Sequence, residues 1–169
     1  TEEVVLKYKD NNIKYIKVKN NGVIAKSRNI GISNAEGDWI AFLDSDDWWE
    51  KNKLDACINC LIKNMNTDLI YHDLELVNKN NKTLFKKSIK SLRLARPIIK
   101  DLMLKGNTIC NSSVIVRKEI INEIGGINES KDIIAAEDFN KWLRVAEISD
   151  NFISSFFARS LIVAIAALL

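Results

Sequence analysis

The chain has 169 residues, of which 47% are hydrophobic and 28% are charged, and its net charge is +3. This length suffices for one domain with a buried core, and the composition is that of a folded soluble protein rather than of a disordered one. The small, scattered positive charge excludes the concentrated basic face that nucleic-acid binding requires, so no nucleic-acid partner is expected.

Helix and strand patterns alternate along the chain. In the first half of the chain, we expect a helix over 2–8, a strand over 13–18, a helix over 23–33, a strand over 39–43 and a helix over 50–65. In the second half, we expect a strand over 68–77, a helix over 97–104, a strand over 114–117, a helix over 118–124 and a helix over 137–148. This alternation predicts an α/β fold with a mainly parallel sheet flanked by helices.

The three cysteines are too few for a secreted disulfide scaffold. Cys57 and Cys60 form a C-x-x-C pair, but no second pair follows and His72 is the only histidine, so a zinc site would lack ligands. We expect both cysteines to pack on one side of a helix. A reduced, cytoplasmic protein is predicted.

The last part of the sequence, residues 152–169, is almost wholly apolar. It just reaches the length of a membrane-spanning helix, but Arg159 in its middle argues against spanning. The sequence therefore divides into a domain over 1–151 and an apolar tail over 152–169. Two interpretations of the tail stay open: a peripheral contact with the inner face of the cell membrane, or a buried or frame-shifted end.

An acidic cluster directly follows the buried apolar run of residues 39–43. Asp44, Asp46 and Asp47 stand close together, and adjacent like charges at the edge of a core raise one another's pKa. A divalent cation removes that cost, and carboxylate oxygens suit Mg²⁺ or Mn²⁺ held together with a diphosphate. The alternative is a solvated turn in which Asp46 or Asp47 caps the next helix.

Two blocks of the sequence resemble glycosyltransferase family 2, whose members have the GT-A fold. The first block contributes Ala25, Arg28, Asn29, Ala35, Gly37, Trp39 and the D-x-D-D motif of residues 44–47; the second spans 107–129 and continues into Glu137, Asp138, Phe139, Trp142, Leu143 and Arg144. Several elements match in order, which makes the resemblance far more specific than a D-x-D motif alone.

The resemblance implies an inverting transferase that moves a sugar from a nucleoside-diphosphate sugar, here expected to be a UDP-sugar, to a saccharide or lipid-linked acceptor in bacterial surface polysaccharide synthesis. Asp138 is implied as the catalytic base. The implied donor-binding residues are Arg28, Asp44, Asp46 and Asp47, with Asp46 as the ligand of Mn²⁺ or Mg²⁺. An acceptor or sugar pocket is expected from Trp48, Trp49 and Glu137, although either tryptophan could instead belong to the core.

This chain departs from the family's pattern at its beginning, where the resemblance implies two further strands. The fold is therefore expected to be a GT-A domain truncated at the N-terminus, and an inactive fragment that binds nucleotide sugar is one alternative. A haloacid dehalogenase-type phosphohydrolase is the other, because its motif also places D-x-D after a strand. That family expects Thr or Val where this chain has Trp48.

Overall fold

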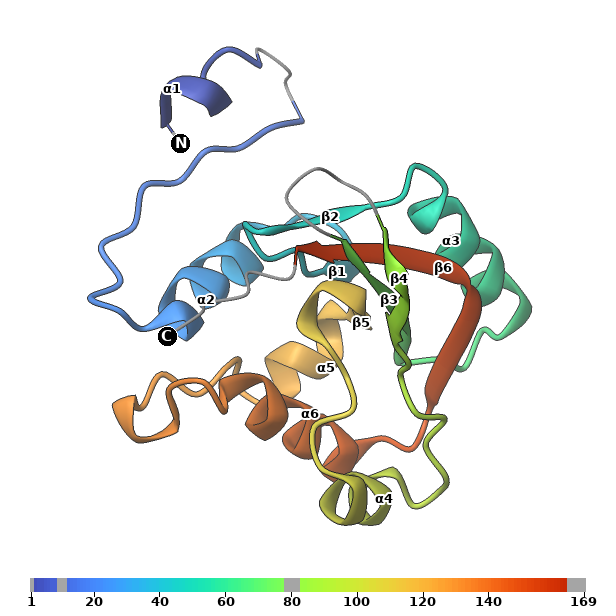
Figure 1. Cartoon of the computed structure of the whole chain (residues 1–169). Helices are drawn as coiled ribbons and strands as arrows, with labels where there is room; N and C mark the ends of the chain where they lie inside the picture. Colours follow the sequence, from blue (N-terminus) through green and yellow to red (C-terminus); the bar gives the residue numbers. More distant parts are fainter. Residues whose placement is uncertain (1, 9–11, 78–82, 164–169) are drawn as a thin grey trace.

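The computed structural model describes residues 2–8, 12–77 and 83–163 (Figure 1). Its helices are α1 (Glu2–Val5), α2 (Ile24–Asn34), α3 (Lys53–Lys63), α4 (Ile98–Lys105), α5 (Lys118–Glu123) and α6 (Glu137–Ile148), with 3₁₀ turns η1 (Asn111–Ser113) and η2 (Lys131–Ile133). Its strands are β1 (Trp39–Ala41), β2 (Asp47–Trp49), β3 (Leu69–Val77), β4 (Thr83–Ile89), β5 (Ile115–Arg117) and β6 (Phe152–Val163). Helices predicted from apolar periodicity are confirmed, and α6 has the predicted bounds.

The strands form one sheet in the order β1-β5-β3-β6-β2, and β4 also pairs with β3. Among the described strands only β3 and β6 pair in parallel, whereas β1/β5, β5/β3, β3/β4 and β6/β2 are antiparallel. The α/β class is therefore confirmed, but the expectation of a mainly parallel sheet is wrong for these strands.

The reason lies in which strands are neighbours. The crossover from β1 through α3 to β3 does give two strands of the same direction, as a helical connection normally does. The short strand β5 then inserts between them and runs against both. Alternation of helix and strand predicts the direction of successive strands, but it does not predict which later strand inserts between them.

Helices cover both faces of the sheet, with α4, α5 and α6 grouped on one side and α3 on the other (Figure 1). Strand residues alternate between the two layers, as the pleat requires. Toward α2, α4, α5 and α6 the core holds Ile40, Phe42, Leu69, Tyr71, Val114, Val116 and Trp142. Toward α3 a smaller cluster holds Cys57, Ile70 and Ile115, with Trp39 and Cys60 packed against it. The prediction that both cysteines pack along one helix is confirmed.

Two sequence expectations need correction. Residues 13–18 form no strand, because no other described strand pairs with them, and Ile13, Tyr15 and Ile16 remain partly exposed. The apolar segment from Phe152 is no separate tail over its first part: residues 152–163 are β6, which lies between β3 and β2. Apolar residues in a row suit a strand within a sheet as well as they suit a membrane. Residues 164–169 lie outside the described part.

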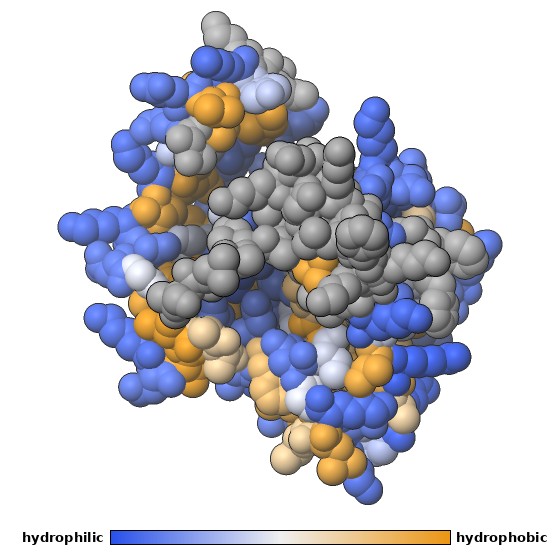
Figure 2. Space-filling model, in the orientation of Figure 1, coloured by the Kyte–Doolittle hydropathy of each residue, from blue (hydrophilic) through white to orange (hydrophobic). Residues whose placement is uncertain are grey.

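In the part of the face that is coloured in Figure 2, hydrophilic residues alternate with hydrophobic ones, and some of the hydrophobic residues belong to the N-terminal segment that leads to α2. Val4, Leu6 and Ile13 of this segment are exposed. Within the described ranges, no helix is both long and apolar enough to be a candidate membrane span.

Candidate active site

Asp44 lies just beyond β1, where the chain leaves the sheet. Its backbone N–H donates to Ser112 Oγ at 3.0 Å, which fixes the loop against η1. Its Oδ1 accepts from Arg28 Nη2 at 2.6 Å and from Asn111 Nδ2 at 3.0 Å. The first carboxylate of the D-x-D-D motif is thus held by a cation and an amide, so its orientation is set before any ligand arrives.

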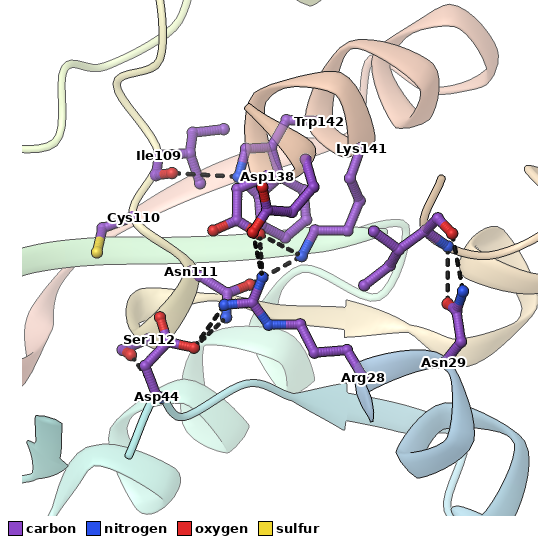
Figure 3. A network of polar contacts seen from close by, with 12 residues as sticks. Arg28, Asn29, Asp44, Ile109, Cys110, Asn111, Ser112, Asp138, Lys141 and Trp142 are labelled. Atoms are coloured by element: carbon purple, nitrogen blue, oxygen red, sulfur yellow. Dashed lines mark hydrogen bonds and ion pairs between the residues drawn. The ribbon is translucent and has the colours of Figure 1, made fainter. Parts of the chain in front are cut away.

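Asp138 lies in the first turn of α6, and Arg28 connects it to Asp44. Arg28 Nη1 donates to Asp138 Oδ1 at 2.9 Å, while the other end of the same guanidinium holds Asp44. The side chain of Arg28 is only 13% exposed. Arg28 and Asp138, which are 110 positions apart in the sequence, are thus in direct contact, and the largely buried guanidinium lies between the two carboxylates in Figure 3.

A second cation reaches Asp138 from the same helix. Lys141 Nζ lies 3.2 Å from Asp138 Oδ1 and donates to Asn111 Oδ1 at 2.8 Å. Since Asn111 also donates to Asp44, the five side chains Arg28, Asp44, Asn111, Lys141 and Asp138 form a closed ring of contacts (Figure 3). We call this set the polar ring. It joins α2, the loop after β1, η1 and α6.

The remaining acidic residues of the motif differ in burial. Asp46 is exposed and makes no hydrogen bond or ion pair within the part of the chain that the structure describes. Asp47 is half-buried at the start of β2, and its pKa is raised, first by burial and then by the nearby charges of Asp46 and Asp44, although a hydrogen bond to Ser112 opposes this. The repulsion expected among the clustered carboxylates thus contributes to the raised pKa of Asp47.

Asp46 offers an exposed carboxylate, and carboxylate oxygens suit Mg²⁺ or Mn²⁺. No group of three or more His, Cys, Asp or Glu residues suited to a metal occurs among residues 2–8, 12–77 and 83–163. That is compatible with Mg²⁺, which usually takes one or two protein carboxylates and completes its shell with phosphate oxygens and water. The residues present therefore fit a metal that arrives with a diphosphate.

Of the three residues expected to line a sugar pocket, Glu137 contacts the ring through Arg28, and Trp49 contacts Ser112, which follows Asn111. Trp49 donates its indole N–H to the Ser112 carbonyl at 3.1 Å, so it is partly committed to packing, while Trp48 beside it is half-buried. Glu137 is largely buried, with Oε1 3.6 Å from Arg28 Nη1, and its Oε2 has no hydrogen-bond partner within the described residues. A hollow of about 340 Å³ between α2 and β1 is lined by residues that include Arg28.

Known proteins resemble this chain in sequence and in fold. The family described as "Glycosyltransferase like family 2" matches residues 1–157. The chain belongs to this family of glycosyltransferases. It spans about half the length of the curated relatives and solved structures described next.

One relative is the Escherichia coli UDP-Glc:alpha-D-GlcNAc-diphosphoundecaprenol beta-1,3-glucosyltransferase WfgD, 30% identical over 89% of this chain and 54% of that protein. An uncharacterized glycosyltransferase of Methanocaldococcus jannaschii is 26% identical over 85% of this chain and 48% of that one. Among solved structures, S. aureus TarS 1-349 superposes with a TM-score of 0.67 at 19% identity, covering 96% of this chain and 47% of TarS. Another crystal structure holds TarS 1-349 in complex with UDP, with a TM-score of 0.66 at 18% identity. These neighbours show the GT-A-type fold.

Other residues of the two matched sequence blocks support the site without touching the ring. Asn29, next to Arg28, holds the backbone of Ile127 from both sides, accepting from its N–H at 2.8 Å and donating to its carbonyl at 2.7 Å. Gly126 has φ +78°, and a Cβ there would lie 3.0 Å from Asn29 Oδ1, so the turn needs glycine. Arg144 donates to the carbonyls of Gly126 and Ile124. The two sequence blocks are thus tied together by the residue that follows Arg28.

Sequence reasoning missed two members of the polar ring, Asn111 and Lys141. Asn111 stands in the block that was matched to the family, but nothing in its local pattern marks it. For Lys141 a signal existed: it lies between Asp138 and Trp142 on a side of α6 that turns toward the core, where a lysine is out of place. Buried polar residues on an apolar helix face are candidates for partners of a site.

Proposed function

We propose that the protein transfers a sugar from a UDP-sugar to a hydroxyl of a saccharide or lipid-linked acceptor, with inversion at the anomeric carbon. The observation that carries this proposal is the bridge through Arg28, which holds Asp44 at 2.6 Å and Asp138 at 2.9 Å. It brings the carboxylate expected on the donor side next to the carboxylate expected to act as base.

In the reaction, the acceptor oxygen attacks the anomeric carbon from the face opposite the diphosphate. The new carbon–oxygen bond forms as the bond from the anomeric carbon to the phosphate oxygen breaks, and the nucleoside diphosphate leaves with that electron pair. The acceptor proton passes to Asp138. Arg28 and Lys141 both contact Oδ1 of this residue, and no hydrogen bond of the described residues uses Oδ2, which is therefore the oxygen assigned to take the proton.

The donor is held on the other side of Arg28. Asp44 is assigned to the ribose of the nucleotide, Asp47 supports the same loop, and Asp46 would hold the Mg²⁺ or Mn²⁺ ion. Such a cation neutralises charge that develops on the leaving diphosphate, a stabilisation worth several kcal/mol. The names of the E. coli glucosyltransferase and of the UDP complex of TarS favour a UDP-sugar over other donors and, from the former, a lipid-linked acceptor.

The acceptor is expected beside Glu137 and Trp48. A buried carboxylate oxygen without a partner, as at Glu137 Oε2, costs about 1–3 kcal/mol or more, and a sugar hydroxyl would satisfy it. Work on a lipid-linked acceptor would bring the protein to the inner face of the cell membrane.

To test the proposal, the protein is incubated with Mn²⁺ and a panel of nucleoside-diphosphate sugars. Two quantities are measured: the release of nucleotide and the binding of the donor. Asp46→Asn should remove the enhancement of UDP binding by Mn²⁺, whereas Asp55→Asn, an exposed aspartate of α3, should keep it. Equal Mn²⁺ dependence in both variants would overturn the metal assignment.

Asp138→Asn should lower transfer about 10²–10⁴-fold while the donor still binds, since it removes the proton acceptor. Glu119→Gln, which alters an exposed acid in the first turn of α5, is the matched control and should transfer normally. Full transfer by Asp138→Asn would exclude this residue as the base. Hydrolysis of phosphate monoesters with a phosphorylated Asp44 would instead favour a phosphohydrolase.

A further inference from the structure

We infer that Lys141 is a positioning residue for the transfer reaction: its buried ammonium anchors one oxygen of Asp138 to Asn111 and thereby fixes the base relative to the donor-side carboxylate Asp44. This inference rests on the proposed function for the role of Asp138. It concerns a lysine that has no part in the chemistry assigned so far.

The environment of Lys141 is built for a charged group. Its side chain is 0% exposed, and Nζ lies 4.0 Å from the ring centroid of Phe42 and 4.1 Å from that of Trp142. Burying an ammonium is costly unless partners replace its water. Here an amide oxygen at 2.8 Å, a carboxylate oxygen at 3.2 Å and two aromatic faces replace it.

The direction of these contacts orients Asp138. Lys141 and Arg28 approach the same atom, Oδ1, from α6 and from α2. A carboxylate gripped at one oxygen by two cations cannot rotate freely, so Oδ2 keeps a fixed direction. The sequence separation of three residues puts Lys141 on the same face of α6 as Asp138, so the grip is part of the helix itself.

Asn111 extends the effect to the donor side. Its Oδ1 accepts from Lys141, and its Nδ2 donates to Asp44 Oδ1 at 3.0 Å. The amide is 3% exposed and the lysine fully buried, so neither reaches a substrate. Lys141 therefore acts through Asp138 and Asn111. Its loss should lower kcat, whereas the KM for the donor should rise by a much smaller factor.

The charges that face Lys141 come from three elements. Asp138 belongs to α6, Arg28 to α2, and Asp44 to the loop after β1. Glu137 of α6 contacts Arg28. Burial lowers the pKa of Lys141 to about 8, with Asp138 acting in the opposite direction and Arg28 in the same one. Above pH 8 the ammonium loses its charge, so the grip on Asp138 weakens and kcat should decline there.

The first experiment measures the contact itself and needs no activity. In the protein labelled with ¹³C-lysine, the Lys141 signal is assigned by its absence in Lys141→Met, and its pKa is followed by NMR in the wild type and in Asp138→Asn. Because an opposite charge nearby favours the charged form, the pKa of Lys141 should fall by about one unit in the variant. An unchanged pKa would overturn the inference.

The second experiment is a double-mutant cycle on transfer. Lys141→Met, which fills the same space, should lower kcat on the order of 10- to 100-fold, because misplacing a catalytic group by about 1 Å has that size of effect. In the Asp138→Asn background the same substitution should have no further effect, as expected for residues that act as a unit. If the fold-losses of kcat in the two single variants instead multiply in the double variant, Lys141 has a merely structural role and the inference is overturned.

Controls separate this inference from the proposed function. Lys53→Met replaces another fully buried lysine, one that contacts a carbonyl and a ring but forms no ion pair among the described residues, and it should keep kcat. In the wild type kcat should decline above about pH 8, whereas in Lys141→Met this decline should be absent. If Asp138→Asn transfers normally, the proposed base fails; if it is inactive while Lys141→Met equals the wild type, only the present inference fails.

Discussion

Two buried lysines, Lys141 and Lys53, show how differently the same side chain is used in two regions of the molecule. Both are 0% exposed, and both lie over aromatic rings, Lys141 over Phe42 and Trp142 and Lys53 at 3.9 Å from the ring centroid of Trp49. Each ammonium also donates a hydrogen bond of 2.8 Å to an oxygen. Burial and packing are therefore alike.

The difference lies in the charges around them. Lys141 faces the carboxylate of Asp138 at 3.2 Å inside the polar ring. Lys53 donates to the Ser112 carbonyl, makes no ion pair within the described residues, and has His72 as a titratable neighbour. Burial accordingly lowers the pKa of Lys53 to about 7 but that of Lys141 only to about 8. The carboxylate, rather than the aromatic packing, therefore keeps the lysine of the site charged.

The largest expected effect concerns Lys53 and the pH dependence of stability. Its pKa is about 7 in the folded protein and about 10.5 when unfolded, so the unfolded chain binds more protons between these values. The free energy of unfolding should therefore rise with pH across this window, by on the order of 5 kcal/mol in total for this group. Urea denaturation at pH 7, 8.5 and 10 should show the rise relative to Lys53→Met. If the stability of the two proteins changes with pH in the same way, Lys53 does not have the lowered pKa that distinguishes it from Lys141.

A contribution of the same sign, but in a lower pH window, is expected from His72, whose pKa is influenced by the charge of Lys53. Burial lowers its pKa from 6.5 to about 4, so the folded protein keeps a neutral imidazole where the unfolded chain is protonated. Stability should fall as the pH drops from 6.5 to 4, by on the order of 3 kcal/mol. Thermal unfolding of wild type and His72→Gln at pH 7 and pH 4.5 measures this difference. A wild type that loses no more stability than the variant would contradict it.

The smallest effect tests the separation of the two regions. The positive charge of Lys53 contributes to the low pKa of His72, so Lys53→Met should raise that pKa by less than about one unit, whereas Lys141→Met should leave it unchanged. The measurement is simple because His72 is the only histidine, and its ring signals need no assignment in an NMR titration. Equal responses to both substitutions would mean that the regions are coupled.

Much of the fold and part of the site were predictable from local patterns. Apolar periodicity predicted α6 at its observed bounds, because a helix is specified by residues three and four positions apart. The order of the motif residues pointed to Asp44, Asp46 and Asp138. The strand expected over 13–18 is wrong because a strand needs a neighbour. The apolar run that forms β6 suggests a tail because it does not reveal which strand it will join.

Local sequence patterns therefore suffice to predict the glycosyltransferase family, the helices and the acidic residues, since each is encoded over a short stretch or a fixed spacing. Only the tertiary structure decided that Arg28 joins Asp44 to Asp138 and that Lys141 and Asn111 close the ring. Those contacts link residues as far as 110 positions apart, and their strength depends on burial, which a side chain acquires only when the layers of the fold meet.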